Sequence, residues 1–456
     1  DVCHPLGTAR VGSEVNMIDW EKVGQEAAQL LAGYLRMQTA NPPGNEEEAA
    51  FYLKEFLEKH GFQVKLFQSA PQRSNLVARL EGDGSKRPIL LYNHMDVVEA
   101  DATRWSCDPF GGEIRDGYVW GRGAIDMKGM GIMQLLALVL LAQEQPKRTR
   151  DIIFLAGADE EKGSQFGAKW MVEHHWQEID AEYAWDEGGF GMSDLFGPQP
   201  VFTVAVAEKK DLWLKLIAHG EPGYSGIPQR ETSINTLLHA LERVQMLNSA
   251  YELHGVTREM FKRVSQRFSF PKNIILRNLD KKLCFKMALP GLSQSPKVDA
   301  MLRDTLSVTV LKAGGKENII PEKAEAILDM RLLPGKSPQQ AIDRLHNLIG
   351  DERVEIEVIE APEPSVTSDM HSEFFEVLSS VLKRNVPEGL CTPLLTPGTT
   401  DSAFFRQKGV QSYGLIPIIL DPGEMDRYHG IDERISIRNL ELGTRVIFEV
   451  LREMIA

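Results

Sequence analysis

The spacing of apolar and polar positions predicts alternating helices and strands before the middle of the chain. From Asp19 to Leu35 apolar residues recur at helical spacing, and short apolar runs bounded by turn residues follow at 63–67, 75–80 and 88–93. Alternating helices and strands favour a mostly parallel sheet with helices on both faces. We therefore predict an α/β fold with a mostly parallel central sheet flanked by helices.

The pattern changes after Gly189. Strands are expected at 201–206, 211–219, 307–313 and 324–332, and amphipathic helices at 232–247 and 338–349. Two helices on one antiparallel sheet make a small α+β domain. Between its halves, residues 249–297 are long and irregular, with apolar side chains among basic ones. We interpret this stretch as an insertion packed on the small domain, in preference to a channel for an acyl chain.

A chain of 456 residues exceeds what one core usually supports, so more than one domain is expected. We predict a catalytic domain in two parts, 17–203 and 361–456, interrupted by an inserted domain at 204–360. Residues 1–16 fit neither part. Cys3-His4-Pro5 and the residues after it resemble a fragment of a glucose-methanol-choline oxidoreductase signature, and we interpret them as a non-native leader.

Charge, cysteine usage and the length of apolar runs limit the partners. The formal net charge of -14 argues against binding to nucleic acid. The longest apolar run, 135–142, is too short to span a bilayer, so no membrane partner is expected. Four cysteines without Cys-x-x-Cys spacing are typical of free thiols in a reducing compartment, which indicates a cytoplasmic protein.

Polar residues that suit metal chemistry follow three of the predicted strands. His94 and Asp96 end one strand, Asp159-Glu160-Glu161 follow a second at 151–156, and Asp186-Glu187 follow a third at 183–185. Each group alone is more commonly a helix cap or a hydrogen-bonded core residue. Together, carboxylates that meet at one edge of a sheet repel one another unless a cation is bound. With histidine present, zinc is the favoured ion.

Five motifs follow one another along the chain: His94-x-Asp96-x-Val98, Trp105-Ser106-x-Asp108-Pro109-Phe110, Gly121-Arg122-Gly123-x-x-Asp126-Met127-Lys128-Gly129, Asp159-Glu160-Glu161 and Asp186-Glu187-Gly188. Their order resembles the M20 family of di-zinc metallopeptidases and aminoacylases, most closely its branch of aminoacylase 1 and carboxypeptidase S. The similarity runs from about residue 20 to the C-terminus.

The resemblance implies two divalent metal ions, preferably Zn²⁺, with Co²⁺ or Mn²⁺ as alternatives. It assigns their ligands as His94 and Glu187 on one ion, Glu161 and His429 on the other, and Asp126 between them. Asp186 is the alternative to Glu187 as a ligand.

Two further acids are assigned to catalysis. The resemblance implies that Asp96 accepts a hydrogen bond from the other ring nitrogen of His94, which would fix its tautomer. Glu160 is the candidate general base that takes a proton from water.

The resemblance also implies a substrate with a free carboxylate, and four residues are expected to bind it. Arg331 and Asn318 lie in segments similar to those that grip a substrate carboxylate, and Gly398 would line the pocket. The alternative for Arg331 is an ion pair with an acid on a neighbouring strand. Many family members carry a lid histidine where this chain has Tyr224, whose hydroxyl could donate a hydrogen bond to an oxyanion.

By analogy with the family, the inserted domain acts as a lid or pairs two chains into a homodimer. The predicted function is hydrolysis of the amide bond of an N-acyl amino acid or short peptide by a metal-activated water. One alternative is a carboxypeptidase or dipeptidase in place of an acylase. Two others are a catalytically silent binding protein with the same fold, which the missing lid histidine favours, and an oxidoreductase, which only the leader suggests.

Overall fold

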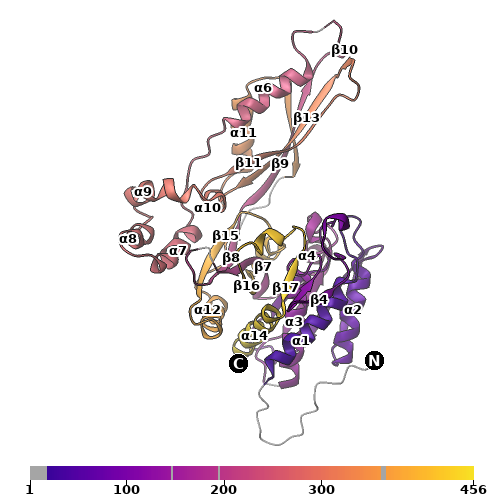
Figure 1. Ribbon diagram of the computed structural model, residues 1–456, viewed down its shortest axis with the longest axis vertical. Coiled ribbons are helices and arrows are strands. Elements are labelled where there is room, and N and C mark those ends of the chain that lie inside the picture. The colour runs from indigo at the N-terminus through magenta and orange to yellow at the C-terminus, as the bar shows by residue number, and fades with distance from the viewer. Residues whose placement is uncertain (1–17, 145–146, 194–195, 228, 361–365) are drawn as a thin grey trace, which may run out of the picture.

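The computed structural model describes residues 18–456 except 145–146, 194–195, 228 and 361–365. The predicted leader, residues 1–16, therefore lies outside the described residues. Figure 1 shows two parts: a broad body that carries the C-terminus, and a narrow arm above it formed by the middle of the chain.

The body is built on an eight-stranded sheet with the order β1-β2-β6-β3-β7-β16-β8-β15. Its centre, β6-β3-β7-β16, is parallel, whereas β1 and β2 are antiparallel additions and β8 runs antiparallel to β16. The predicted α/β fold with a mostly parallel sheet is confirmed. The strands are β1 (Val64–Ala70), β2 (Arg73–Leu80), β3 (Ile89–His94), β6 (Ile152–Gly157), β7 (Tyr183–Met192), β8 (Val201–Glu208), β15 (Leu390–Thr396) and β16 (Gln411–Leu420).

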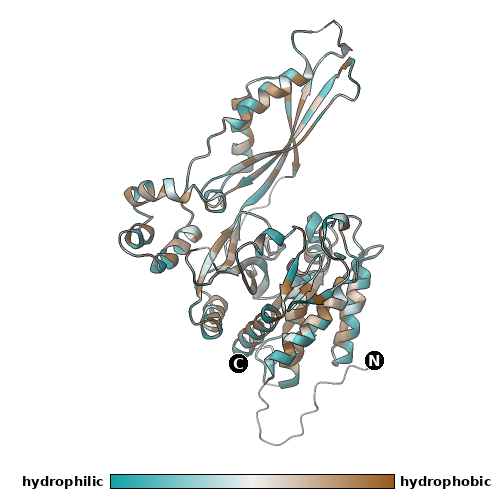
Figure 2. Cartoon of the chain, in the orientation of Figure 1, coloured by the Kyte–Doolittle hydropathy of each residue, from teal (hydrophilic) through white to brown (hydrophobic). Residues whose placement is uncertain are grey.

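Helices cover both faces of this sheet, because alternate residues of each strand point to opposite sides. Leu91 of β3 packs in the larger core with α1 (Trp20–Leu35), α2 (Glu46–Lys59), α3 (Lys128–Glu144), α12 (Glu373–Asn385) and α14 (Ile437–Met454). Its neighbour Leu90 packs in a second core with α4 (Ala168–His174), α5 (Trp176–Ile179) and α13 (Ser402–Gln407). The helix α3 is buried around its whole circumference, and Figure 2 shows how apolar residues dominate it.

A small three-stranded sheet lies beside the main one. The turn at Asp116-Gly117 joins β4 (Glu113–Arg115) to β5 (Tyr118–Trp120). The third strand is β17 (Arg434–Ser436), which brings the loop before it next to the region that follows β5.

The arm contains an antiparallel sheet in the order β11-β13-β9-β14, with its own apolar core. Its strands are β9 (Lys210–His219), β11 (Thr305–Ala313), β13 (Lys323–Leu332) and β14 (Val354–Glu360), and α6 (Ser233–Gln245) and α11 (Pro338–Ile349) pack on it. A short pairing of β10 (Gly223–Tyr224) with β12 (Ile319–Ile320) forms the outer tip of the arm (Figure 1).

Four helices occupy the irregular insertion: α7 (Gly255–Val264), α8 (Lys272–Arg277), α9 (Lys282–Leu292) and α10 (Pro296–Ala300). Their apolar side chains share a core with Val201 of β8 and Leu394 of β15. The prediction that this insertion packs on the small domain is therefore wrong, since its core is completed by the edge of the main sheet. Among the described residues, no helix is long and apolar enough to cross a membrane.

Candidate active site

The parallel strands of the main sheet bring the predicted polar residues to one edge. His94 is the last residue of β3 and pairs in register with Gly157, the last residue of β6. The turn after β6 forms a short 3-10 helix, Glu160–Lys162. On the other side of β3, strand β7 carries Glu187. Carboxyl ends of parallel strands are where open α/β sheets place their ligands.

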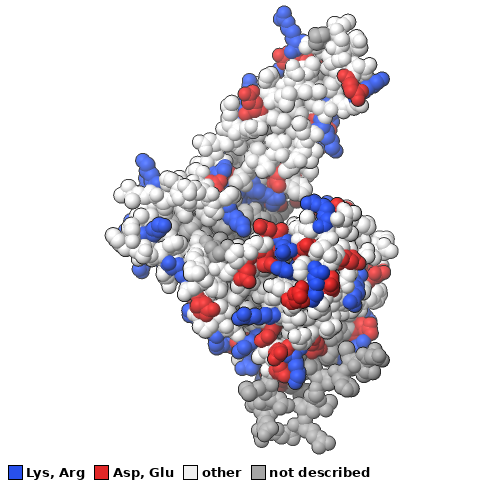
Figure 3. Space-filling view, viewed as in Figure 1, with Lys and Arg blue, Asp and Glu red and all other residues white. Residues whose placement is uncertain are grey.

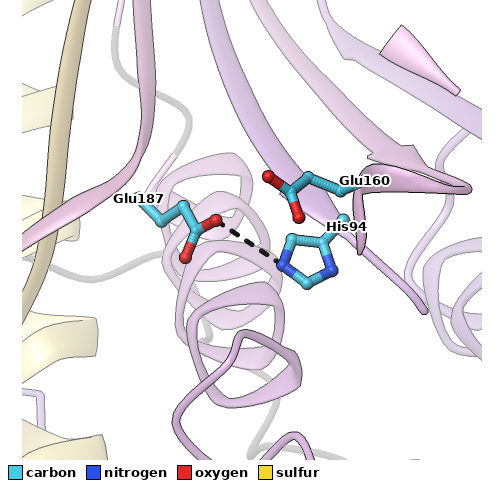
Figure 4. Close-up of side chains that lie close together, drawn as sticks. All are labelled: His94, Glu160 and Glu187. Carbon is cyan, nitrogen blue, oxygen red and sulfur yellow. Dashed lines mark ion pairs between the residues drawn. The ribbon is translucent and has the colours of Figure 1, made fainter. Parts of the chain in front are cut away.

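One group of side chains surrounds His94. Its Nε2 lies 3.1 Å from Asp126 Oδ1 and 3.7 Å from Glu187 Oε1. Figure 4 shows the carboxylates of Glu160 and Glu187 turned toward the imidazole ring. Single ligand atoms of His94, Glu160 and Glu187 lie within 4.8 Å of one another, as do those of His94, Asp126 and Glu161. Ligand atoms this close together can bind the same metal ion.

His429 completes the set from the loop before β17. Its Nε2 lies 2.6 Å from Asp126 Oδ2 and 3.4 Å from Glu161 Oε1. Asp126 therefore presents one carboxylate oxygen to His94 and the other to His429, which is the geometry of a bridging ligand. The backbone of His429 is in the left-handed region, with φ of 56°, a conformation that costs energy in a non-glycine residue and is common at functional sites.

The electrostatics of the cluster favour a cation. Burial raises the pKa of Glu160 well above its usual range, and the negative charge of Glu187 adds to the shift. Burial also raises the pKa of Glu187, together with the charge of Asp126. Hydrogen bonds to Asp126 and Glu161 raise the pKa of His429 to about 10. A divalent ion among these buried carboxylates would favour their charged forms and offset their mutual repulsion.

A buried oxygen also fits metal binding. Glu161 Oε1 is buried and faces His429 Nε2 at 3.4 Å, which is long for a charge-assisted hydrogen bond. A buried acceptor held this loosely is costly, so such an atom calls for a ligand. The donor set of two imidazoles and several carboxylates suits zinc and related divalent ions.

Asp96 lies beside His94 and also contacts the turn after β6. The nearer acceptor for His94 Nδ1 is the backbone carbonyl of Asp96, at 2.9 Å, whereas its carboxylate lies 3.5 Å away. The carboxylate accepts the backbone N–H of Glu160 at 3.0 Å and that of Glu161 at 3.1 Å. Asp96 thus holds the backbone that carries two other site residues, and it orients His94 mainly through its main chain.

Sequence reasoning missed two buried networks that support the cluster. In the first, Asn41 donates hydrogen bonds to both Asp96 and Asp159, each at 2.9 Å. Arg73 then joins Asp159 to Glu46, at 2.8 and 2.6 Å. The only available signal was the spacing of these polar residues at the ends of apolar segments.

The second network holds the loop of Asp126. The buried carboxylate of Glu433 accepts the backbone N–H groups of Ile125 and Asp126 at 2.7 and 3.0 Å, and it pairs with Arg122 at 2.7 Å. Glu433 follows the His429 loop, so it ties the two chain segments that face each other across Asp126. Its position four residues after His429 was visible in the sequence, but its partners were not.

The predicted substrate residues lie apart from the cluster. Arg331 donates to Asp329 at 2.8 Å and also to Asp211, so it makes the ion pairs that were the alternative prediction. Asp211 accepts a hydrogen bond from Thr399 at 2.5 Å, which places Arg331 near the loop of Gly398.

Tyr224 and Asn318 meet at the outer tip of the arm. The carbonyl of Asn318 accepts the N–H of Ser225, and Tyr224 is 64% exposed. Figure 1 shows β10 at the end of the arm farthest from β7. Within one chain, neither residue reaches the cluster.

An α/β body that gathers two histidines and several buried carboxylates at one sheet edge defines the class of metal-dependent hydrolases. The family model for peptidase family M20/M25/M40 matches residues 90–453, and the chain belongs to this family. The sequence-based resemblance and the prediction of an amide-bond hydrolase are thereby confirmed.

Similar proteins span most of the chain. The N-fatty-acyl-amino acid synthase/hydrolase PM20D1 of Xenopus tropicalis is 32% identical over 454 residues, covering 95% of this chain and 86% of the relative. A probable carboxypeptidase S-like 2 of Dictyostelium discoideum is 31% identical, covering 91% and 82%. The M20 family metallo-carboxypeptidase Sso-CP2 from Sulfolobus solfataricus has the same fold, with a TM-score of 0.72 at 20% identity over 94% of this chain and 98% of that one.

Proposed function

We propose that this M20 hydrolase cleaves the amide bond of N-acyl amino acids by means of two divalent metal ions. The observation that carries the proposal is the Asp126 carboxylate, with one oxygen at 3.1 Å from His94 and the other at 2.6 Å from His429. His94 and Glu187 would hold one ion, and Glu161 and His429 the other. Zinc is the proposed ion, with cobalt or manganese as alternatives.

When bound, such ions polarise a carbonyl and lower the pKa of a water molecule to near 7. Glu160 is the proposed general base, because it lies beside His94 without being one of the five assigned ligands. Its carboxylate can accept a proton from water and return it to the leaving amine. Asp96 positions Glu160 through the backbone hydrogen bond described above.

The substrate class is supported by the relatives. The Xenopus relative is named for N-fatty-acyl-amino acids and the Dictyostelium relative for carboxypeptidase activity. Both substrates present a carboxylate next to the scissile amide. We propose that Arg331 and the loop of Gly398 receive this carboxylate, with Arg331 exchanging one of its present acidic partners for it.

The arm is proposed to act as a lid that pairs two chains into a homodimer. Two features support this. Strand β11 is an edge strand with exposed apolar residues, among them Val310 and Leu311, and such edges pair with other strands. Tyr224 and Asn318 lie at the tip, where they could meet only the site of a second chain. A cytoplasmic location stays a proposal, supported by the free thiols of Cys107, Cys284 and Cys391.

The test is a product-resolved assay with enzyme of defined metal content. Acetyl amino acids, long-chain acyl amino acids and dipeptides are compared by kcat/KM. We expect an acyl amino acid to be preferred over dipeptides by at least about tenfold. A preference for dipeptides would replace the acylase proposal with a peptidase, and no hydrolysis by metal-loaded enzyme would favour a silent binding protein.

A further inference from the structure

The helical insertion has a charge opposite to that of the whole protein. Residues 255–300 contain ten basic and three acidic side chains, within a chain whose formal net charge is -14. The excess is concentrated at residues 272–286, in α8, the first turns of α9 and the link between them, where five basic residues accompany one acid, Asp280. These are Lys272, Arg277, Lys281, Lys282 and Lys286. In Figure 3 this part of the surface shows Lys and Arg without Asp or Glu.

The five basic side chains are available for binding. All are exposed, and none forms an ion pair with another described residue. By contrast, Lys262 and Arg263 of the neighbouring helix α7 are both paired with Glu259. An uncompensated group of cations attracts an anionic surface.

Large apolar side chains project among these cations. Phe270 is 76% exposed and Ile274 51%, just before and within α8. On α9, Leu283 is 70% and Met287 59% exposed. The inner faces of these helices already pack in the core shared with β8 and β15. The exposed apolar residues therefore contribute nothing to that core, and leaving them in water has a cost.

Spacing places the two kinds of side chain in parallel rows on α9. Leu283 and Met287 are four residues apart, as are Lys282 and Lys286, so each pair lies along one line of the helix. Apolar residues beside lysines suit the boundary of a bilayer, where the former enter the acyl region and the latter extend to the headgroups. Figure 1 shows α8 and α9 projecting at the side of the molecule, away from the arm tip and from the helices of the body.

We propose that α8 and α9 dock this protein on an anionic phospholipid surface. The four apolar residues, Phe270, Ile274, Leu283 and Met287, enter the interface, and the five basic residues bind the lipid phosphates. This differs from the expectation of no membrane partner, which rested on apolar runs that are too short to span a bilayer. The docking is peripheral and needs no spanning helix.

The experiment is flotation of the full metal-loaded enzyme with lipid vesicles, measured without substrate so that its outcome is independent of the proposed function. Vesicles of phosphatidylcholine alone are compared with vesicles that also contain phosphatidylglycerol. We expect binding at least about tenfold stronger to the mixed vesicles, weakening as salt is added. Equal binding to both, or none to either, would overturn the proposal.

Two double variants locate the surface. Leu283→Ser with Met287→Ser removes apolar contacts, and Lys282→Glu with Lys286→Glu reverses two charges. Each is expected to lose about tenfold or more of the vesicle affinity. The proposal fails if the charge variant loses affinity while the apolar variant keeps it, because the apolar residues would then not enter the interface.

Matched controls lie away from the insertion. Leu238 and Met246 are 52% and 65% exposed near α6, and Lys147 and Lys408 are exposed lysines of the body. Leu238→Ser with Met246→Ser, and Lys147→Glu with Lys408→Glu, should bind vesicles as the parent does. If they lose as much affinity as the α9 variants, the assigned surface is wrong. An unchanged circular dichroism spectrum and melting temperature show that each variant has folded.

Discussion

The carboxylate of Asp96 accepts the backbone N–H of Glu160 at 3.0 Å, although the two residues are 64 positions apart in the chain. The second oxygen of Asp96 accepts from the N–H of Glu161 at 3.1 Å and from the side chain of Asn41 at 2.9 Å. A single buried acid at the end of β3 thus sets the position of the turn after β6. That turn carries both the proposed general base and a proposed metal ligand.

The first prediction concerns this link. Asp96→Asn keeps the volume of the side chain but replaces one acceptor oxygen by a donor, which opposes the backbone N–H groups of Glu160 and Glu161. We expect a loss of about 10- to 100-fold in kcat/KM or in metal affinity, as is usual for residues that orient metal ligands. Kinetics and metal analysis measure the effect.

Asp101→Asn is the control, since Asp101 only caps the exposed 3-10 helix Ala102–Arg104. Activity and metal content should stay at the parent level. An Asp96→Asn enzyme as active as this control would show that the hydrogen bonds to the turn do not matter.

The second prediction separates base from ligand. Glu160→Gln cannot accept a proton, so we expect kcat to fall by about 10²- to 10⁴-fold while metal content is unchanged. Glu161→Gln should instead reduce metal content, because Glu161 supplies a proposed ligand atom. Activity of Glu160→Gln within about threefold of the parent would refute the base assignment.

The fold was predictable because its elements are marked by local signals. The apolar run expected at 88–93 became β3, which spans Ile89–His94. The convergence of His94, Glu161 and Glu187 followed from a general property of parallel strands, whose carboxyl ends meet at one edge.

Long-range partners were not predictable in the same way. Glu433 holds the Asp126 loop from more than 300 residues away, and no local pattern names its partners. The insertion was assigned to the wrong neighbour because its apolar residues fit any apolar surface, and only the tertiary structure shows Val201 and Leu394 opposite them. The distance of Tyr224 from the cluster likewise depends on how the arm is placed.

The third prediction is that the two proposed metal ions leave at different rates. His429 is 45% exposed at its side chain, whereas His94 is fully buried. A chelator should therefore remove the ion held by His429 and Glu161 first. We expect two phases in metal release, followed with a colorimetric chelator.

His429→Ala should abolish the fast phase and leave the slow one. The matched change His94→Ala affects the slow phase. Release in one phase from the parent enzyme, with a single ion per chain, would contradict the two-metal proposal.

The fourth prediction tests the role of the arm tip. If the hydroxyl of Tyr224 donates to an oxyanion in the site of a second chain, Tyr224→Phe should lower kcat by about 10²- to 10³-fold with little change in KM. Sedimentation velocity checks that the variant has the same oligomeric state as the parent. Tyr251→Phe removes a hydroxyl that hydrogen-bonds to Asp299 instead, and should leave kcat unchanged. Equal kcat for the two variants would remove the oxyanion proposal.

The last prediction concerns stability at the junction of body and arm, where Lys209 is buried between β8 and β9. Its ammonium group donates to the carbonyls of Ala300 and Arg303 at 3.1 and 3.0 Å and to the hydroxyl of Thr305 at 2.8 Å. Burial lowers the pKa of Lys209 to about 8 from 10.5. Below pH 8 the group is charged in both the folded and the unfolded chain, and burying that charge costs stability.

Between pH 8 and 10.5 the folded chain has released this proton while the unfolded chain still binds it. The unfolded state then binds more protons, so the free energy of unfolding gains a contribution that rises with pH, by at most about 1.4 kcal/mol per pH unit. Lys209→Met lacks this contribution. Urea unfolding of both proteins over this pH range should show the parent gaining stability relative to Lys209→Met, because other titrating groups cancel in the difference. Lys312→Met changes an exposed residue of β11, so its difference from the parent in free energy of unfolding should not change with pH. If the difference for Lys209→Met is also independent of pH, the charge of Lys209 is not buried in the folded protein.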